Sequence, residues 1–212
     1  METFDKQLAA KLLEIKAVKL RPQEPFTWAS GWKSPIYCDN RKPISYPALR
    51  SAIKVEEARL VCEMYPQATC IAGVATGAIT QGALVADALG LPYVYIRPKP
   101  KDHGLGNLIE GDLMPGARVV VIEDLVSTGK SSLAAVEALR AAGAEVLGMI
   151  AGFTYQFPVA EAHFREAGVE LTTLSHYTAV LEAALASGYI SESDLSTLHE
   201  WRANPSQWRQ EP

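Results

Sequence analysis

The chain has few cysteines, no excess of basic residues and no long apolar run, and each shortage excludes a class of protein. Its three cysteines, Cys38, Cys62 and Cys70, are odd in number and lack CxxC spacing, so neither a disulfide framework nor a zinc site is indicated. No run of about 18 apolar residues occurs, and the first six residues show no basic start before an apolar core. We therefore expect a cytoplasmic protein without a membrane partner.

The charge balance is mildly acidic. Lys and Arg total 20 against 24 Asp and Glu, which gives a formal net charge of -4. Non-specific nucleic-acid binding usually requires a basic patch or stripe, so we expect no nucleic-acid partner. With 48% hydrophobic residues, the chain can bury one sizeable core. We predict a single domain, residues 1–212, with a hood at about 1–45, a core at about 46–190 and a C-terminal helix and tail at about 191–212.

Strand-like and helix-like patterns alternate along the chain. Such alternation predicts an α/β fold with a parallel sheet and right-handed crossovers. Apolar runs predict strands at residues 70–75, 93–96, 118–122, 146–151 and 169–174. Helical spacing predicts helices at residues 5–18, 47–64, 79–89, 132–142, 158–167, 177–187 and 192–203.

The strongest signal for function is the segment 119–132. Branched apolar residues at 119–122 predict a strand buried on both faces, and Glu123 and Asp124 follow where that strand is expected to end. Residues 127–131 read Ser-Thr-Gly-Lys-Ser and lead into a predicted helix. The free N–H groups and the dipole of a helix start suit a phosphate. Carboxylates beside such a phosphate cradle predict a site for a phosphorylated sugar.

Two other interpretations of this segment begin from the same residues. In the first, the acids are merely solvated and the serine and threonine are only helix N-caps. In the second, Gly129-Lys130-Ser131 ends a nucleotide-binding P-loop of the form G-x-x-x-x-G-K-[ST]. Asp124 stands where that motif requires its first glycine, so the P-loop interpretation fails.

The segment instead resembles the motif that binds 5-phosphoribosyl 1-pyrophosphate (PRPP) in type I phosphoribosyltransferases, which joins a hydrophobic strand, two acids and a Thr/Ser-Gly loop. The resemblance implies that superfamily's fold, a five-stranded parallel sheet flanked by helices, with a small N-terminal hood. It also implies PRPP contacts from Glu123, Asp124, Leu125, Val126, Ser127, Thr128, Gly129, Lys130 and Ser131.

A basic segment follows the strand predicted at residues 93–96. Arg97, Lys99, Lys101 and His103 lie close together, and interspersed prolines and Gly104 prevent a stable helix. A short basic run is usually a solvated turn, but a structureless stretch of about 20 residues is commonly a lid or binding loop. Such a lid would close over a polyphosphate and exclude water.

The spacing of this segment resembles the Arg-x-x-x-Lys-x-His-Gly pattern in the mobile loop of the orotate phosphoribosyltransferase family. Members commonly carry a lysine after the arginine, where this chain has Pro98. The resemblance implies a homodimer whose lid loop reaches the other subunit's site, and Mg²⁺ held through PRPP without direct protein ligands. It implies catalytic roles for Lys101, His103, Glu123 and Asp124, and further PRPP contacts from Arg97, Lys99, Lys101 and His103.

Two other segments resemble the same family. Residues 26–37 match its F-T-x-x-S-G-x-x-S-P-x-Y pattern, although Ala29 replaces a lysine found in some members. Taken alone, this segment is more often a hydrophobic strand over a core. Residues 72–78 form a glycine-containing turn at the place of the family's pyrophosphate loop, although such turns are common. The resemblance implies orotate contacts from Ser34, Ile36, Tyr37 and Ser127, and pyrophosphate contacts from Ala75, Thr76 and Gly77.

The resemblance implies Mg²⁺-dependent transfer of the 5-phosphoribosyl group from PRPP to orotate, giving orotidine 5'-phosphate and pyrophosphate in pyrimidine biosynthesis. Displacement at the anomeric carbon would pass through an oxocarbenium-like transition state. The alternatives are a phosphoribosyltransferase for another base and a PRPP-sensing regulator. Members of the family often place an arginine near residue 155, where this chain has Tyr155 and Gln156, and contacts from these two are left open.

Overall fold

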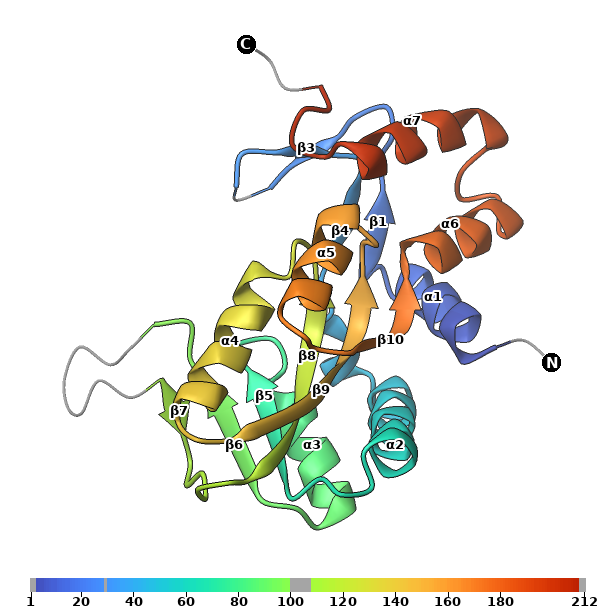
Figure 1. Ribbon diagram of the computed structural model, residues 1–212. Coiled ribbons are helices and arrows are strands. Elements are labelled where there is room, and N and C mark those ends of the chain that lie inside the picture. The colour runs from blue at the N-terminus through green and yellow to red at the C-terminus, as the bar shows by residue number, and fades with distance from the viewer. Residues whose placement is uncertain (1–2, 29, 100–107, 210–212) are drawn as a thin grey trace.

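A six-stranded sheet in the order β10-β9-β8-β5-β6-β7 runs through the centre of the molecule (Figure 1). The structure, a computed structural model, describes residues 3–28, 30–99 and 108–209. Neighbouring strands pair in parallel from β10 to β6, whereas β7 pairs antiparallel with β6. The α/β class with a parallel core is therefore confirmed, and β7 adds an edge strand that was not predicted. The parallel strands are β5 (Cys70–Val74), β6 (Tyr93–Ile96), β8 (Arg118–Val126), β9 (Glu145–Thr154) and β10 (Leu171–His176), and β7 is Ile109–Glu110.

Helices cover both faces of this sheet (Figure 1). Side chains alternate across β8, so that Val119 and Val121 join one apolar cluster while Val120 and Ile122 join the other. The first cluster contains residues of α4 and α5, and the second contains residues of α1, α2, α3 and α6. The helices are α1 (Phe4–Glu14), α2 (Pro47–Met64), α3 (Ile79–Leu89), α4 (Lys130–Ala141), α5 (Pro158–Glu166), α6 (Tyr177–Ala186) and α7 (Glu192–Ala203).

Several predicted element boundaries differ from the structure, and two of the differences have identifiable reasons. The first helix ends at Glu14 and not near Val18, because Lys16 adopts a φ of 56° and Val18 begins a strand paired with β4. Strand β8 continues to Val126 and does not end at Ile122, because β9 extends beside it and supplies pairing partners as far as Thr154. The acid pair is thus part of the strand that pairs with β9.

The hood joins both ends of the chain. Strands β1 (Val18–Leu20) and β4 (Ile36–Cys38) pair antiparallel, and so do β2 (Phe26–Thr27) and β3 (Lys33–Ser34). Helix α7 lies against these strands at the top of Figure 1. Its fully buried Trp201 donates a hydrogen bond from Nε1 to the carbonyl oxygen of Lys33 at 3.2 Å. Trp208, in the segment after α7, is buried as well.

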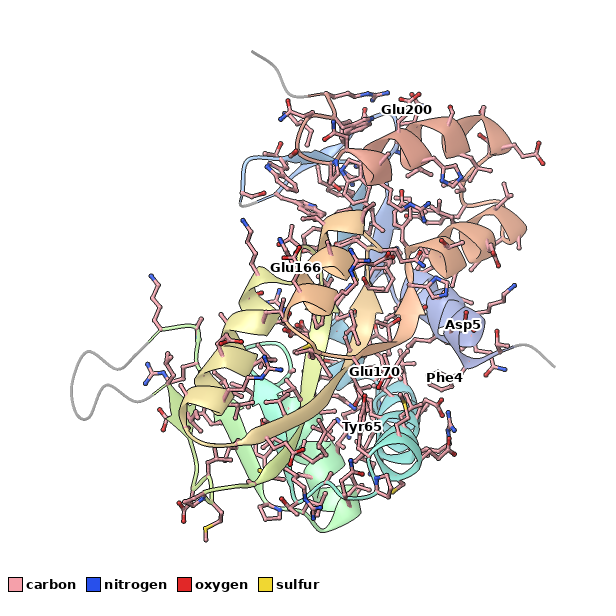
Figure 2. All side chains as sticks on the ribbon, viewed as in Figure 1. Phe4, Asp5, Tyr65, Glu166, Glu170 and Glu200 are labelled. Carbon is pink, nitrogen blue, oxygen red and sulfur yellow. The ribbon has the colours of Figure 1, made fainter. Side chains whose placement is uncertain are left out.

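Helix α2 is fixed to the sheet at its C-terminal end. The Tyr65 hydroxyl lies 3.4 Å from Oε2 of Glu170, and both side chains are labelled in Figure 2. A Cβ on Gly148 would lie 2.2 Å from that hydroxyl, so the glycine leaves room for the tyrosine ring. Within the described residues, no helix combines the length and apolar character needed to cross a bilayer.

Candidate functional site

The candidate site lies where the carboxyl ends of β5 and β8 meet. The chain passes from β5 to β6 on one side and later returns to place β8 on the other side of β5. Such a reversal of strand order opens a crevice beyond the strand ends, the usual ligand position in an open α/β sheet. The acid pair on β8 and the loop after β5 therefore face one crevice.

The loop after β5 contacts the acid pair directly. A Cβ built on Gly77 would lie only 2.0 Å from Oδ2 of Asp124, so no larger residue fits while both groups keep their places. The peptide bond between Ala75 and Thr76 is cis. The predicted pyrophosphate loop and the predicted ribose-binding acid are thus neighbours in space.

Burial distinguishes the two acids. Glu123 is 4% exposed, and its carboxylate accepts hydrogen bonds from the Asp124 backbone N–H at 2.9 Å and from Ser132 Oγ at 2.7 Å. Burial, together with the charge of Asp124, raises the pKa of Glu123 to about 8. Burial also raises the pKa of the partly exposed Asp124. The more deeply buried Glu123 therefore retains its proton more readily, and Asp124 carries the negative charge of the pair.

The segment after β8 forms a phosphate-sized loop. Gly129 has a φ of 79°, and a Cβ there would lie 2.8 Å from the Phe164 ring, so glycine is required by both conformation and space. His163 on α5 holds the loop through a 2.8 Å contact between its Nδ1 and the carbonyl oxygen of Thr128. Helix α4 begins at Lys130 without a side-chain cap, so its first N–H groups are open to an anion.

A cavity of about 130 Å³ joins this helix start to the loop after β5. Its lining includes Ala75, Arg97 and Ser131. The Arg97 guanidinium pairs with Glu110 through a 3.2 Å contact at the root of the predicted lid. Arg97 is therefore placed to add positive charge beside a pyrophosphate.

The remaining predicted PRPP residues differ in position. Ser127 and Thr128 are partly exposed in the loop, whereas Lys130 and Ser131 are exposed on the first turn of α4. Leu125 packs against the core and Val126 is fully buried, so any contact of these two with PRPP must come from their backbone groups. Lys99 is exposed beside the lid, and Lys101 and His103 lie outside the described residues.

The predicted orotate residues of the hood differ in burial, because successive side chains along its strands point in opposite directions. Ser34 and Ile36 are fully buried, and the Ser34 hydroxyl donates to the Ile36 carbonyl oxygen at 2.7 Å. Tyr37 points the other way and is 40% exposed. Because the Ser34 and Ile36 side chains do not reach the crevice, Tyr37 is the candidate among the three for contact with a base.

The two residues after β9, Tyr155 and Gln156, contact other parts of the protein. Tyr155 is buried among aromatic rings, including Trp28 at a centroid distance of 5.1 Å and Phe157 at 5.5 Å. The Gln156 Oε1 accepts hydrogen bonds from the backbone N–H and the hydroxyl of Thr178. Both side chains therefore stabilise the protein interior.

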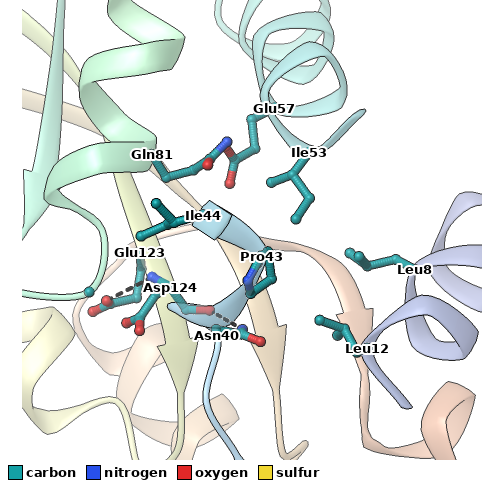
Figure 3. Close-up of a pocket in the computed structure, with 12 residues that line it drawn as sticks. Leu8, Leu12, Asn40, Pro43, Ile44, Ile53, Glu57, Gln81, Glu123 and Asp124 are labelled. Carbon is teal, nitrogen blue, oxygen red and sulfur yellow. Dashed lines mark hydrogen bonds between the residues drawn. The ribbon is translucent and has the colours of Figure 1, made fainter. Parts of the chain in front are cut away.

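Asn40 is a site residue that the sequence patterns missed. Its Nδ2 donates to the carbonyl oxygen of Asp124 at 2.5 Å, which ties the hood to the acid pair. Figure 3 shows this bond beside the cavity that Asn40 lines with Asp124. A single asparagine after a short strand has no characteristic spacing, so no pattern in the sequence could identify it.

The acid pair is also suited to Mg²⁺ bound with a polyphosphate. Mg²⁺ is commonly held by one or two carboxylates together with substrate phosphates, and keeps several waters. Asp124 offers a partly exposed carboxylate next to the Gly77 loop. Among residues 3–28, 30–99 and 108–209, no cluster of three or more His, Cys, Asp or Glu side chains is arranged to bind a metal.

Comparison with known proteins agrees with this arrangement. Residues 57–154 match the phosphoribosyl transferase domain family. Over 208 residues the chain is 64% identical to the orotate phosphoribosyltransferase of Bacteroides fragilis, covering 98% of each chain. Its fold is similar to the crystal structure of orotate phosphoribosyltransferase from Aeropyrum pernix, with a TM-score of 0.70 and 28% identity over 82% of this chain and 97% of that one. The Mycobacterium tuberculosis orotate phosphoribosyltransferase in complex with PRPP gives a TM-score of 0.65 and 25% identity, over 83% of this chain and 98% of that one.

Proposed function

The chain belongs to the orotate phosphoribosyltransferase family, and from this membership we propose that it transfers the 5-phosphoribosyl group of PRPP to orotate. The products are orotidine 5'-phosphate and pyrophosphate, a step of pyrimidine biosynthesis. The observation that carries the proposal is the contact between Gly77 and Asp124 at the crevice between β5 and β8. This contact supports the proposal because, in it, the loop 75–77 binds the pyrophosphate and the neighbouring Asp124 binds the ribose.

Each part of PRPP has a matching surface in this arrangement. The 5-phosphate is bound by the N–H groups and hydroxyls of the loop 127–131. The ribose hydroxyls bind Asp124 and Glu123, and the pyrophosphate lies between the loop 75–77 and Arg97. Binding at the remote 5-phosphate then helps to position the reacting carbon.

The reaction forms a bond from a pyrimidine nitrogen to the ribose anomeric carbon and breaks the bond from that carbon to pyrophosphate, and the proton of the nitrogen is released to solvent or to the departing pyrophosphate. Positive charge develops on the ribose ring, where the ionised Asp124 carboxylate stabilises it. Negative charge develops on pyrophosphate, where Arg97 and, from the lid, Lys101 and His103 stabilise it. Mg²⁺, when bound with PRPP, adds further neutralisation of the departing oxygens.

The lid and the assembly belong to the same proposal. The enzyme acts in the cytoplasm as a homodimer, and each subunit donates its lid loop to the other subunit's site. Support comes from the basic spacing at Arg97, Lys101 and His103, and from the position of Arg97 at the lid root beside the crevice. Closure of such a loop excludes water while the ribose is cationic.

Spectrophotometric loss of orotate in the presence of PRPP and Mg²⁺ tests the proposal. Adenine, hypoxanthine and uracil serve as competing acceptors under the same conditions. We expect turnover with orotate to exceed turnover with each of the others by orders of magnitude. Turnover of a purine without turnover of orotate would overturn the assignment.

A further inference from the structure

The hood segment after β4 lies directly against the acid pair. Asn40 donates to the Asp124 carbonyl oxygen at 2.5 Å, and a Cβ on Gly152 would lie 3.5 Å from Asn40 Nδ2. Gly152 belongs to β9, so the segment is packed over the ends of two central strands. The next residue, Arg41, therefore begins its side chain at the edge of the crevice.

The Nε end of the Arg41 guanidinium is hydrogen-bonded to Asp39, and its terminal nitrogens are exposed. Its Nε donates to Asp39 Oδ1 at 2.7 Å, and its backbone N–H donates to the same oxygen at 3.2 Å. The side chain remains 60% exposed, against 23% for Asp39. Within the described part of the chain, its two terminal nitrogens make no hydrogen bond, so this face of the guanidinium is available to a ligand.

The charge of Arg41 acts on the site. It lowers the pKa of Asp124, although burial outweighs this effect, and the guanidinium also interacts electrostatically with Tyr37. Tyr37 is the exposed aromatic residue of the hood. The Arg41 guanidinium thus interacts electrostatically with both Asp124, the acid proposed to bind ribose, and Tyr37, the ring proposed to meet the base.

Neighbouring cations are directed elsewhere. Lys42 Nζ donates to the carbonyl oxygens of Ile15 and Lys16 at 3.2 and 3.1 Å. Arg50 donates to the Ile44 carbonyl oxygen at 2.9 Å. Lys42 and Arg50 thus direct their charge to backbone oxygens, whereas Arg41 keeps an exposed part of its guanidinium beside the acid pair.

We propose that Arg41 binds the carboxylate of the acceptor base, with Asp39 as the residue that positions it. This inference rests on the proposed function, because orotate is an anion that must approach a site already containing Asp124. A planar guanidinium binds a carboxylate through two parallel hydrogen bonds, and its charge offsets repulsion from the nearby acid. Arg41 therefore determines the preference for a carboxylated pyrimidine.

Steady-state kinetics of Arg41→Gln test this role. We expect the KM for orotate to rise by at least tenfold, while the KM for PRPP stays within twofold of the unaltered enzyme. Arg41→Lys is expected to recover only part of the affinity, because an ammonium lacks the planar pair of donors. Arg59→Gln is the matched control: Arg59 also pairs with carboxylates and is exposed, but lies on the outer surface of α2.

Inhibition by the carboxamide of orotate separates recognition of the carboxylate from a general effect on the site. The inhibition constant of the carboxamide should be similar in the unaltered enzyme and in Arg41→Gln. The affinity for orotate, in contrast, should be lower in Arg41→Gln than in the unaltered enzyme. Equal losses for orotate and PRPP would instead mean that Arg41 supports Asp124, and no loss for either would mean that it has no role; both results overturn the inference. Failure of the unaltered enzyme to use orotate would overturn the proposed function itself.

Discussion

Gly77 shows how one missing side chain shapes the site. Alanine at this position would place a Cβ 2.0 Å from Asp124 Oδ2, so either the loop or the carboxylate must move. We expect Gly77→Ala to lower kcat/KM for PRPP by at least about tenfold, since small misplacements of reacting groups are costly. Steady-state kinetics and a thermal unfolding curve together measure whether the loss is local.

Gly90→Asn provides a control for loss of a glycine. Gly90 ends α3 with a φ of 65°, has open space around its Cα, and lies at a position where asparagine is tolerated. This variant should retain normal kinetics. Normal kinetics in Gly77→Ala as well would show that the contact with Asp124 has no importance for PRPP.

Glu57 is a buried acid that the proposed chemistry does not use. It is fully buried on α2; its Oε2 accepts from Gln81 at 2.8 Å, while its Oε1 has no hydrogen-bond partner within the described residues. Figure 3 shows its carboxyl group beside a cavity that it shares with Asp124. Burial raises the pKa of Glu57 from 4.5 to about 8.

This pKa shift makes a contribution to folding that depends on pH. Between pH 4.5 and about 8 the native state keeps the Glu57 proton while the unfolded state releases it. The free energy of unfolding therefore falls as pH rises through this window, by up to about 1.4 kcal/mol per pH unit. Glu57→Gln, a neutral substitute of similar shape, should remove this part of the slope.

Urea unfolding of both proteins at several pH values from 4.5 to 8.5 measures the difference. Glu123 has a similarly raised pKa but is present in both proteins, so its effect cancels in the comparison. We expect the variant to gain stability relative to the unaltered protein as pH rises. A difference that does not change with pH would mean that Glu57 is ionised in the native state.

At the scale of single elements, β8 shows what local sequence can predict. The apolar run at 119–122 identifies a buried strand, and the acid pair marks the end of it that is proposed to bind ribose. The strand extends through Glu123 and Asp124 to Val126 because β9 supplies pairing partners beside it. Acidic residues have low strand propensity, so the sequence alone predicts that the strand ends before Glu123. Pairing with β9 outweighs this local preference.

The loop between β8 and α4 depends on support from another helix. His163 on α5 contacts the Thr128 carbonyl oxygen at 2.8 Å, and no sequence motif links these two positions. We expect His163→Ala to raise the KM for PRPP several-fold with a smaller effect on kcat, because the phosphate loop loses its fixed position. His199→Ala, an exposed position on α7, is the control for loss of an imidazole. An unchanged KM in His163→Ala would exclude this supporting role.

At the scale of the whole molecule, the hood shows the limit of prediction from local patterns. The motif at 26–37 identifies the segment, but the packing of this segment in the hood depends on Trp201. Trp201 donates a hydrogen bond to the carbonyl oxygen of Lys33, which is 168 residues away in the sequence. Trp201 also packs edge-on against Trp28 at 5.6 Å and Tyr155 at 5.7 Å. Such contacts join residues that no periodicity relates, so the sequence predicts the members of the hood without predicting how they assemble.

The proposed exchange of lid loops between subunits concerns the whole assembly, and mixing two variants that we expect to be inactive tests it. Lys101→Ala removes the proposed lid cation, and Asp124→Asn removes the acid that is proposed to stabilise the ribose. If each lid serves the partner's site, a mixed dimer has one site carrying both defects and one site carrying neither. Random mixing should then restore roughly a quarter of the original activity, as expected for a symmetric dimer with reciprocal exchange.

The control is a mixture of Lys101→Ala with Lys101→Gln, which should remain inactive because every site lacks the lysine. Subunits must be unfolded and refolded together, or co-expressed, so that dimers of all three compositions form. If the lid instead serves its own subunit, each site in a mixed dimer keeps one defect and no activity returns. The restored fraction therefore distinguishes exchange between subunits from closure within one, whatever the absolute rate of either variant.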